Sequence, residues 1–137
     1  MTDHPAPERT SGSDVREARP LMEAVEVFDL AGEIEDLVAE PNWADDRNSR
    51  TLAKEQNLRI LLVALRPGAE LGTDEAHGRM SLQVLRGQVA VSHDGQDASL
   101  CPGQLAALDV GGEWSVRAIE DSAVLLTICW PEERAVT

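Results

Sequence analysis

The most informative part of the sequence lies between residues 81 and 108, which read SLQVLRGQVAVSHDGQDASLCPGQLAAL. Short runs of alternating apolar and polar residues are separated here by Arg86-Gly87, Asp94-Gly95 and Pro102-Gly103. Alternation with a period of two is typical of half-buried strands. Asp-Gly between two such runs is a strong signal for a two-residue hairpin turn. The stretch therefore predicts consecutive antiparallel strands.

The same pattern extends over the rest of the chain after Arg50. We expect eight strands, at 51–55, 58–65, 81–85, 88–93, 98–100, 105–108, 114–119 and 123–130. Short strands without helices between them must be largely antiparallel. Closing them into a barrel or a double-sheet roll protects their edges. The sequence thus predicts an all-β, single antiparallel jelly-roll barrel over residues 51–137.

Ahead of the barrel, the pattern changes twice. Residues 1–20 are rich in proline and small polar residues, which predicts a disordered leader. In residues 21–50, Val25 and Val27 alternate with polar neighbours, which indicates a short N-terminal strand. The helical spacing of Leu30, Ile34, Leu37 and Val38 predicts a helix over 30–40, with Asp29 as its N-cap and Pro41 after its end.

Composition excludes several classes of function. The 137 residues carry 12 basic and 25 acidic side chains, a net charge of −13 that is repelled by nucleic acid and anionic membranes. No apolar run is long enough for a membrane span, and we expect a cytoplasmic protein. Nine of the acidic residues fall in 23–46 without a basic one, which indicates a solvated face or a docking surface for a basic partner.

Four glycines give the barrel segment a regular frame. Gly68 is followed by AELGT and then Asp74, with Gly87 closing the segment, and Gly103 is followed by QLAAL, with Gly111 after it. With this spacing, residues 58–131 resemble the cupin superfamily of small jelly-roll barrels. The resemblance implies tight turns at the glycines, where positive φ angles keep successive strands in register.

Metal-binding cupins hold their ion with two histidines, a glutamate and a later histidine, and the resemblance places these positions at Asp74, Ala76, Met80 and Trp114. Only the Asp74 carboxylate is a ligand for a hard or borderline metal, since an indole donates hydrogen bonds only and a thioether is soft. The position of the motif asparagine is Ala118. We therefore expect the scaffold without the family's metal site and without a cofactor.

A shifted metal site made of Asp74, Glu75 and His77 with Asp109 or Glu113 remains an alternative. Strand alternation argues against it, because residues 75 and 77 face away from residues 74 and 76. His4 in the leader and His93 at a hairpin turn are not expected to bind metal.

Other reactive side chains are given structural roles. Cys101 and Cys129 are expected to be inert buried or half-buried thiols. The arginines of the barrel segment are expected to balance the acidic surface; Arg79 lies closest to the altered motif, and the others are Arg59, Arg66, Arg86 and Arg117.

Three functions remain open. The first is a metal-free, small-molecule-binding barrel with no catalysis assigned, which takes an apolar or amphipathic ligand. Its predicted pocket residues are Asp74, Ala76, Met80, Leu82, Trp114 and Val116. The second is a structural or regulatory module with a closed core. The third is a metal-dependent cupin enzyme, a dioxygenase or isomerase, with an unorthodox ligand set. The resemblance also implies a homodimer that exchanges the segment 23–30.

Overall fold

The structure is a computed structural model that describes residues 24–73, 79–109 and 113–129. Within them the chain forms one helix and nine strands. Their bounds are α1 Leu30–Ala39, β1 Arg47–Lys54, β2 Leu58–Leu65, β3 Glu70–Thr73, β4 Arg79–Arg86, β5 Val89–His93, β6 Gln96–Leu100, β7 Leu105–Asp109, β8 Trp114–Ala118 and β9 Ser122–Cys129. The leader expected at 1–20 lies outside the described residues. No helix in the described part of the chain has the length and apolar character needed to cross a membrane.

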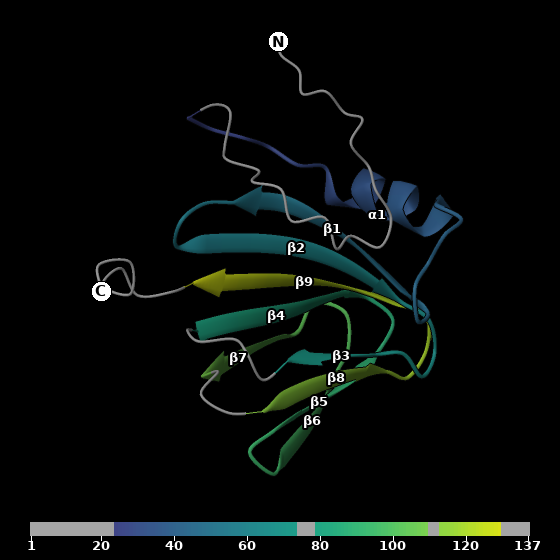
Figure 1. The fold of residues 1–137 in the computed structure, drawn as a ribbon. Helices are drawn as coiled ribbons and strands as arrows, with labels where there is room; N and C mark the ends of the chain where they lie inside the picture. Colours follow the sequence, from purple (N-terminus) through teal and green to yellow (C-terminus); the bar gives the residue numbers. More distant parts are fainter. Residues whose placement is uncertain (1–23, 74–78, 110–112, 130–137) are drawn as a thin grey trace.

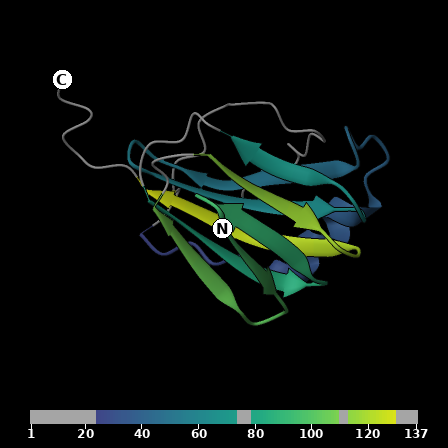
Figure 2. The same ribbon diagram turned by 90° about the horizontal axis from the view of Figure 1, so that it is seen from below.

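The strands form two antiparallel sheets that pack face to face (Figure 1). One sheet has the order β1-β2-β9-β4-β7 and the other the order β3-β8-β5-β6. Seen from below in Figure 2, the smaller sheet lies across the larger one, with α1 on the far side. The expected antiparallel jelly roll is confirmed.

The turns follow the chemistry of the sequence. Asp94 and Gly95 both have positive φ, 53° and 78°, between the paired residues His93 and Gln96, as a two-residue hairpin of the mirror-image type requires. Gly87 also has a positive φ, and a Cβ there would lie 2.7 Å from the Cα of Ser122. At that position the chain therefore needs glycine both for its conformation and for the close approach of the neighbouring backbone.

The two sheets enclose the main hydrophobic core. It is built from inward-facing residues of both sheets, which include Val63, Met80, Leu82, Val84, Val89, Val91, Trp114, Val116, Val124, Leu126 and Ile128. A second core lies on the outer face of the larger sheet, where Ile34 and Leu37 of α1 pack on Leu62, Ala64 and Ala123. This burial explains why the predicted helix forms: its apolar stripe covers the sheet.

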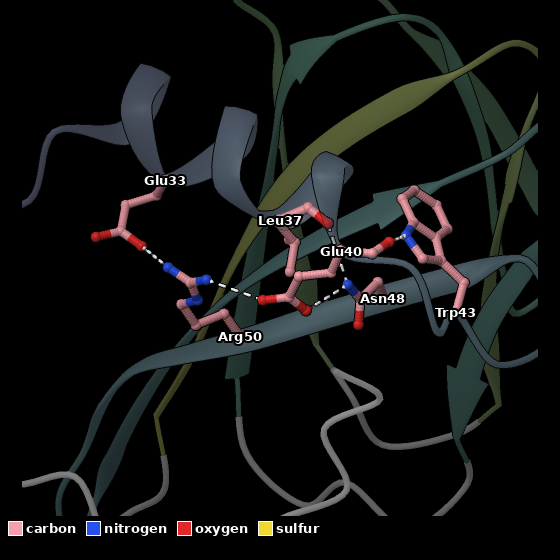
Figure 3. A network of polar contacts seen from close by, with 6 residues as sticks. All are labelled: Glu33, Leu37, Glu40, Trp43, Asn48 and Arg50. Atoms are coloured by element: carbon pink, nitrogen blue, oxygen red, sulfur yellow. Dashed lines mark hydrogen bonds and ion pairs between the residues drawn. The ribbon is translucent and has the colours of Figure 1, made fainter. Parts of the chain in front are cut away.

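A network of polar contacts ties α1 to β1 (Figure 3). The Arg50 guanidinium lies between Glu33 and Glu40 and forms an ion pair with each of them. Asn48, which is 1% exposed, donates from Nδ2 to the Leu37 carbonyl oxygen at 3.1 Å and to Glu40 Oε1 at 2.9 Å. The last turn of the helix thus obtains hydrogen-bond partners from the sheet.

Three local expectations need correction. Residues 24–29 form no strand in this single chain, and Val25 and Val27 are 73% and 84% exposed. β3 was not expected at all, and β1 begins at Arg47 instead of residue 51. Asp29 does stand at the N-cap of α1, but its side chain makes no capping hydrogen bond; its backbone carbonyl accepts from Glu33 N–H at 2.9 Å.

Candidate functional site

An open depression lies at the end of the barrel where the β5–β6 hairpin meets the start of β8. Its lining residues are Ser92, His93, Asp94, Gly95, Glu113, Trp114 and Ser115. We call this place the mouth depression. The β5–β6 turn and the start of β8 lie at the end of the molecule at which β4 begins and β9 ends (Figure 1).

Pairing between β5 and β8 positions the two ring side chains of the mouth depression. His93 on β5 pairs with Trp114 on β8. This pair lies two residues along the strands from the buried pair Val91 and Val116. Residues two apart on a strand point to the same side, so His93 and Trp114 both face the space between the sheets. The depression thus lies at the end of the smaller sheet, where His93 and Trp114 come from its inner face and Ser92 and Ser115 from its outer face.

Trp114 closes the depression toward the core. The side chain is buried, at 7% exposure, within the cluster that also contains Met80 and Ile128. Its Nε1–H has no hydrogen-bond acceptor among the described residues. A buried donor of this kind costs about 1–3 kcal/mol when it stays unsatisfied.

The imidazole of His93 contacts two backbone carbonyl oxygens. Nε2 lies 2.7 Å from the oxygen of Asp109 at the end of β7, and Nδ1 lies 3.1 Å from that of Glu113, just before β8. The hydrogen bonds to Glu113 and Asp109 raise the pKa of His93 above its usual value of 6.5, and the nearby Asp94 carboxylate adds to the increase. The pKa shift thus favours the charged ring.

The predicted pocket residues separate into three groups. Met80, Leu82 and Val116 are buried in the core between the sheets, at 3%, 0% and 0% exposure. Trp114 alone lines the mouth depression as well. Asp74 and Ala76 lie outside the described residues, as do Glu75 and His77 of the shifted set.

The two described residues at the metal positions implied by the resemblance, Met80 and Trp114, do not fit a metal ion. Met80 offers a thioether inside an apolar cluster, and the Trp114 indole has no lone pair to donate in the ring plane. Within the described ranges, no three His, Cys, Asp or Glu side chains gather in a way that could hold an ion. Asp109 and Glu113, considered for a shifted site, meet at His93 through their backbone oxygens.

Two expectations about reactive side chains were wrong. Cys101 and Cys129 are both exposed, since each lies at the margin of a strand. Arg59 does not belong to the acidic surface: it pairs with Ile128, which pairs in turn with Met80, so all three share the inner face of the larger sheet. Alternation along β2 was the signal for this placement. Arg79, by contrast, is exposed and lies 3.7 Å from Asp109, as expected for surface charge balance.

No family model matches the chain, and no curated protein sequence matches it either. Among solved structures, a conserved protein of unknown function from Streptococcus pyogenes is similar, with a TM-score of 0.65 and 24% identity over 86% of this chain and 98% of that one. A cupin superfamily protein from Desulfitobacterium hafniense matches with a TM-score of 0.62 and 14% identity, covering 84% of this chain and 97% of the other.

Salicylate 1,2-dioxygenase from Pseudoaminobacter salicylatoxidans is also similar, with a TM-score of 0.60 and 22% identity over 76% of this chain but only 30% of the enzyme. Two packed antiparallel sheets joined by glycine turns define the protein as a small jelly-roll barrel. Its fold is that of the cupins. At these identities the similarity establishes the fold and leaves the activity open.

Proposed function

We propose that the protein is a cupin-like binding protein that takes a small amphipathic molecule at the mouth depression without a metal at the family's motif positions. The observation that carries this proposal is the Trp114 Nε1–H, a buried donor without an acceptor in the described part of the chain. Native proteins satisfy most such groups. Trp114 offers an unsatisfied N–H donor and an apolar ring at the margin of the core. A ligand with a hydrogen-bond acceptor and an apolar ring would match both.

The packing limits where such a ligand fits. Leu82 and Val116 are fully buried, and Met80 is nearly so, in the cluster that fills the space between the sheets. A ligand at the barrel centre would have to displace these side chains, which costs several kcal/mol in a closely packed core. The mouth depression is open and bordered by Trp114, so a ligand there leaves the core in place and moves only the groups that cover the indole Nε1–H.

The closed core also favours a second candidate function. In the described part of the chain, buried residues from both sheets form one cluster, and a barrel packed in this way would serve as a structural or regulatory module without any ligand. Catalysis is not part of either proposal. The two candidates differ in one property: whether the Trp114 indole responds to small molecules.

The test follows the indole N–H signals of the full chain by ¹H–¹⁵N NMR during titration with two probes. Benzamide carries a ring and a carbonyl acceptor, whereas ethylbenzene has a similar ring without an acceptor. We expect benzamide to shift the Trp114 Nε1–H signal and to leave that of Trp43 unchanged. The indole of Trp43 already donates to the Glu40 carbonyl oxygen at 2.7 Å and therefore has no free donor.

Trp114→Phe is the matched variant, since it keeps an aromatic ring in the core while it removes the donor together with the second ring of the indole. We expect it to weaken benzamide binding and to leave the response to ethylbenzene unchanged. Equal shifts with both probes would contradict the proposal that the indole N–H donates a hydrogen bond to the ligand. No shift with either probe, at any concentration that keeps the protein folded, would refute ligand binding here and favour the closed module.

A further inference from the structure

His93 joins three strands at the mouth depression. It ends β5, and its ring nitrogens reach the Asp109 carbonyl oxygen at the end of β7 and the Glu113 carbonyl oxygen at the entrance to β8, at 2.7 and 3.1 Å. Both contacts fall within the range of normal hydrogen bonds. One side chain therefore fixes the positions of two backbone segments that border the depression.

The chemistry of the two partners determines which form of the ring fits. A carbonyl oxygen only accepts hydrogen bonds, so each ring nitrogen must carry a hydrogen to make its bond. The neutral imidazole has one N–H and one lone pair, and its lone pair would face the second carbonyl oxygen. Only the imidazolium form makes both hydrogen bonds at once.

The charged groups around the ring support the same form. Asp94 follows His93 in the hairpin, and Asp109 contributes its carboxylate as well as its carbonyl; both raise the pKa of His93, together with the two backbone hydrogen bonds. Glu113 also lines the depression. On β4, which pairs with β7, Arg79 forms an ion pair with Asp109 at 3.7 Å. Gln96, the cross-strand partner of His93, and Trp114, opposite it on β8, are neutral.

We propose that His93 is a pH-dependent cross-link that, in its imidazolium form, holds the end of β7 and the start of β8 against β5 and so regulates ligand binding in the mouth depression. The regulatory part rests on the binding function proposed above. With both hydrogen bonds made, the walls beside Trp114 are fixed before a ligand arrives, and preorganisation of this kind increases affinity. Loss of one bond frees one of the two segments.

The direction of the pH dependence follows from the raised pKa. The cross-link is complete below the usual histidine pKa of 6.5, and it is lost as the pH rises through the higher pKa of the folded protein. We therefore expect the mouth depression to be best ordered, and to bind most tightly, on the acidic side of that transition.

The test uses the full chain with His4 and His77 replaced by Gln, so that His93 gives the only imidazole signals. We expect its NMR titration midpoint above 6.5. The carbonyl ¹³C signals of Asp109 and Glu113 should follow the same midpoint, as should the Trp114 indole signal. A midpoint at or below 6.5, or carbonyl signals that do not follow the titration of the ring, would overturn the proposal.

Benzamide affinity is then measured on both sides of the midpoint, in this background and with His93→Gln added. We expect tighter binding on the acidic side and no pH dependence in the His93→Gln variant. Equal affinity on both sides, with benzamide bound, would refute the regulation and leave the binding function intact. If benzamide fails to bind at either pH while the carbonyl signals titrate with His93, the binding function fails and the cross-link stands.

Discussion

The contacts of Asn48 allow the attachment of α1 to the barrel to be tested quantitatively. Asn48 is 1% exposed, and its amide donates both to the Leu37 carbonyl oxygen and to the Glu40 carboxylate. Substitution Asn48→Ala removes both hydrogen bonds and leaves two acceptors in a place that water reaches poorly. The variant should therefore unfold more easily than the parent protein, although no apolar contact of the main core changes.

The expected loss follows from the two bonds. A neutral hydrogen bond contributes about 1 kcal/mol and one to a charged group about 1.5–3 kcal/mol, so the free energy of unfolding should fall by about 2–4 kcal/mol. In urea, with a slope of about 2 kcal/mol per molar, the midpoint should shift by about 1–2 M. Circular dichroism measures this transition. Asn48→Asp should be less stable still at neutral pH, because a second carboxylate would face Glu40.

Asn42 provides the matched control, since it is exposed in the loop after α1. Asn42→Ala should change the unfolding free energy by no more than about 0.5 kcal/mol. If Asn48→Ala costs less than about 1 kcal/mol, or no more than Asn42→Ala, then the Asn48 hydrogen bonds do not hold the helix, and the Arg50 ion pairs and the apolar packing of α1 are sufficient.

Four further predictions concern the barrel. Trp114→Ala should lower the unfolding free energy by about 3–5 kcal/mol in chemical denaturation, as a cavity in a closed core does; a nearly unchanged stability would contradict the packing described for Trp114. Gly87→Ala should be more destabilising than Gly103→Ala in the same assay, because both residues have positive φ but only at Gly87 would a Cβ meet neighbouring atoms. Light scattering at micromolar concentration should give the mass of a homodimer, as expected for cupins that pair through the segment containing the exposed Val25 and Val27; a monomer mass alone counts against it. Elemental analysis after dialysis against a weak chelator should find no stoichiometric transition metal, and one equivalent would revive the enzyme hypothesis.

The fold could be predicted because its strongest determinants are local. Alternation and the Asp94-Gly95 turn fix the β5–β6 hairpin, and Gly68, Gly87 and Gly103 all have the positive φ that their place in the turns requires. β3 was missed for an equally physical reason. Its sequence, ELGT, is four residues long and contains Gly72, so it forms a strand only because β8 pairs with it.

The first strand was misplaced because propensity was overridden by tertiary contacts. The segment RNSR at 47–50 resembles a loop, yet it pairs with β2, and the side chains of Asn48 and Arg50 bind the helix above it. Val25 and Val27 show the opposite error. Their alternation is typical of a strand, but in the single chain no neighbouring strand pairs with them. In both segments, the presence or absence of a neighbouring strand determines whether a strand forms, and the local sequence pattern does not contain that information.

The candidate site was harder to predict, because its features depend on contacts across the barrel. The hairpin position of His93 was evident from the sequence, but its two carbonyl partners come from β7 and from the residue before β8. The inward direction of Arg59 likewise depends on the register of β2 with β9. Trp114 was identified because it occupies a motif position, and its burial agrees with the alternation along β8.

The apolar side chains at two of the metal positions implied by the resemblance also have a consequence for packing. Imidazole and carboxylate groups inside a barrel are stable when a metal ion holds them, and without the ion their burial costs several kcal/mol. This chain has Met80 and Trp114 at two of these positions, and both belong to the hydrophobic core. If the resemblance assigns these positions correctly, the side chains that stand in place of two expected metal ligands therefore also fill space between the sheets. The proposed ligand would then bind at the end of the barrel, where Trp114 and His93 both line the mouth depression.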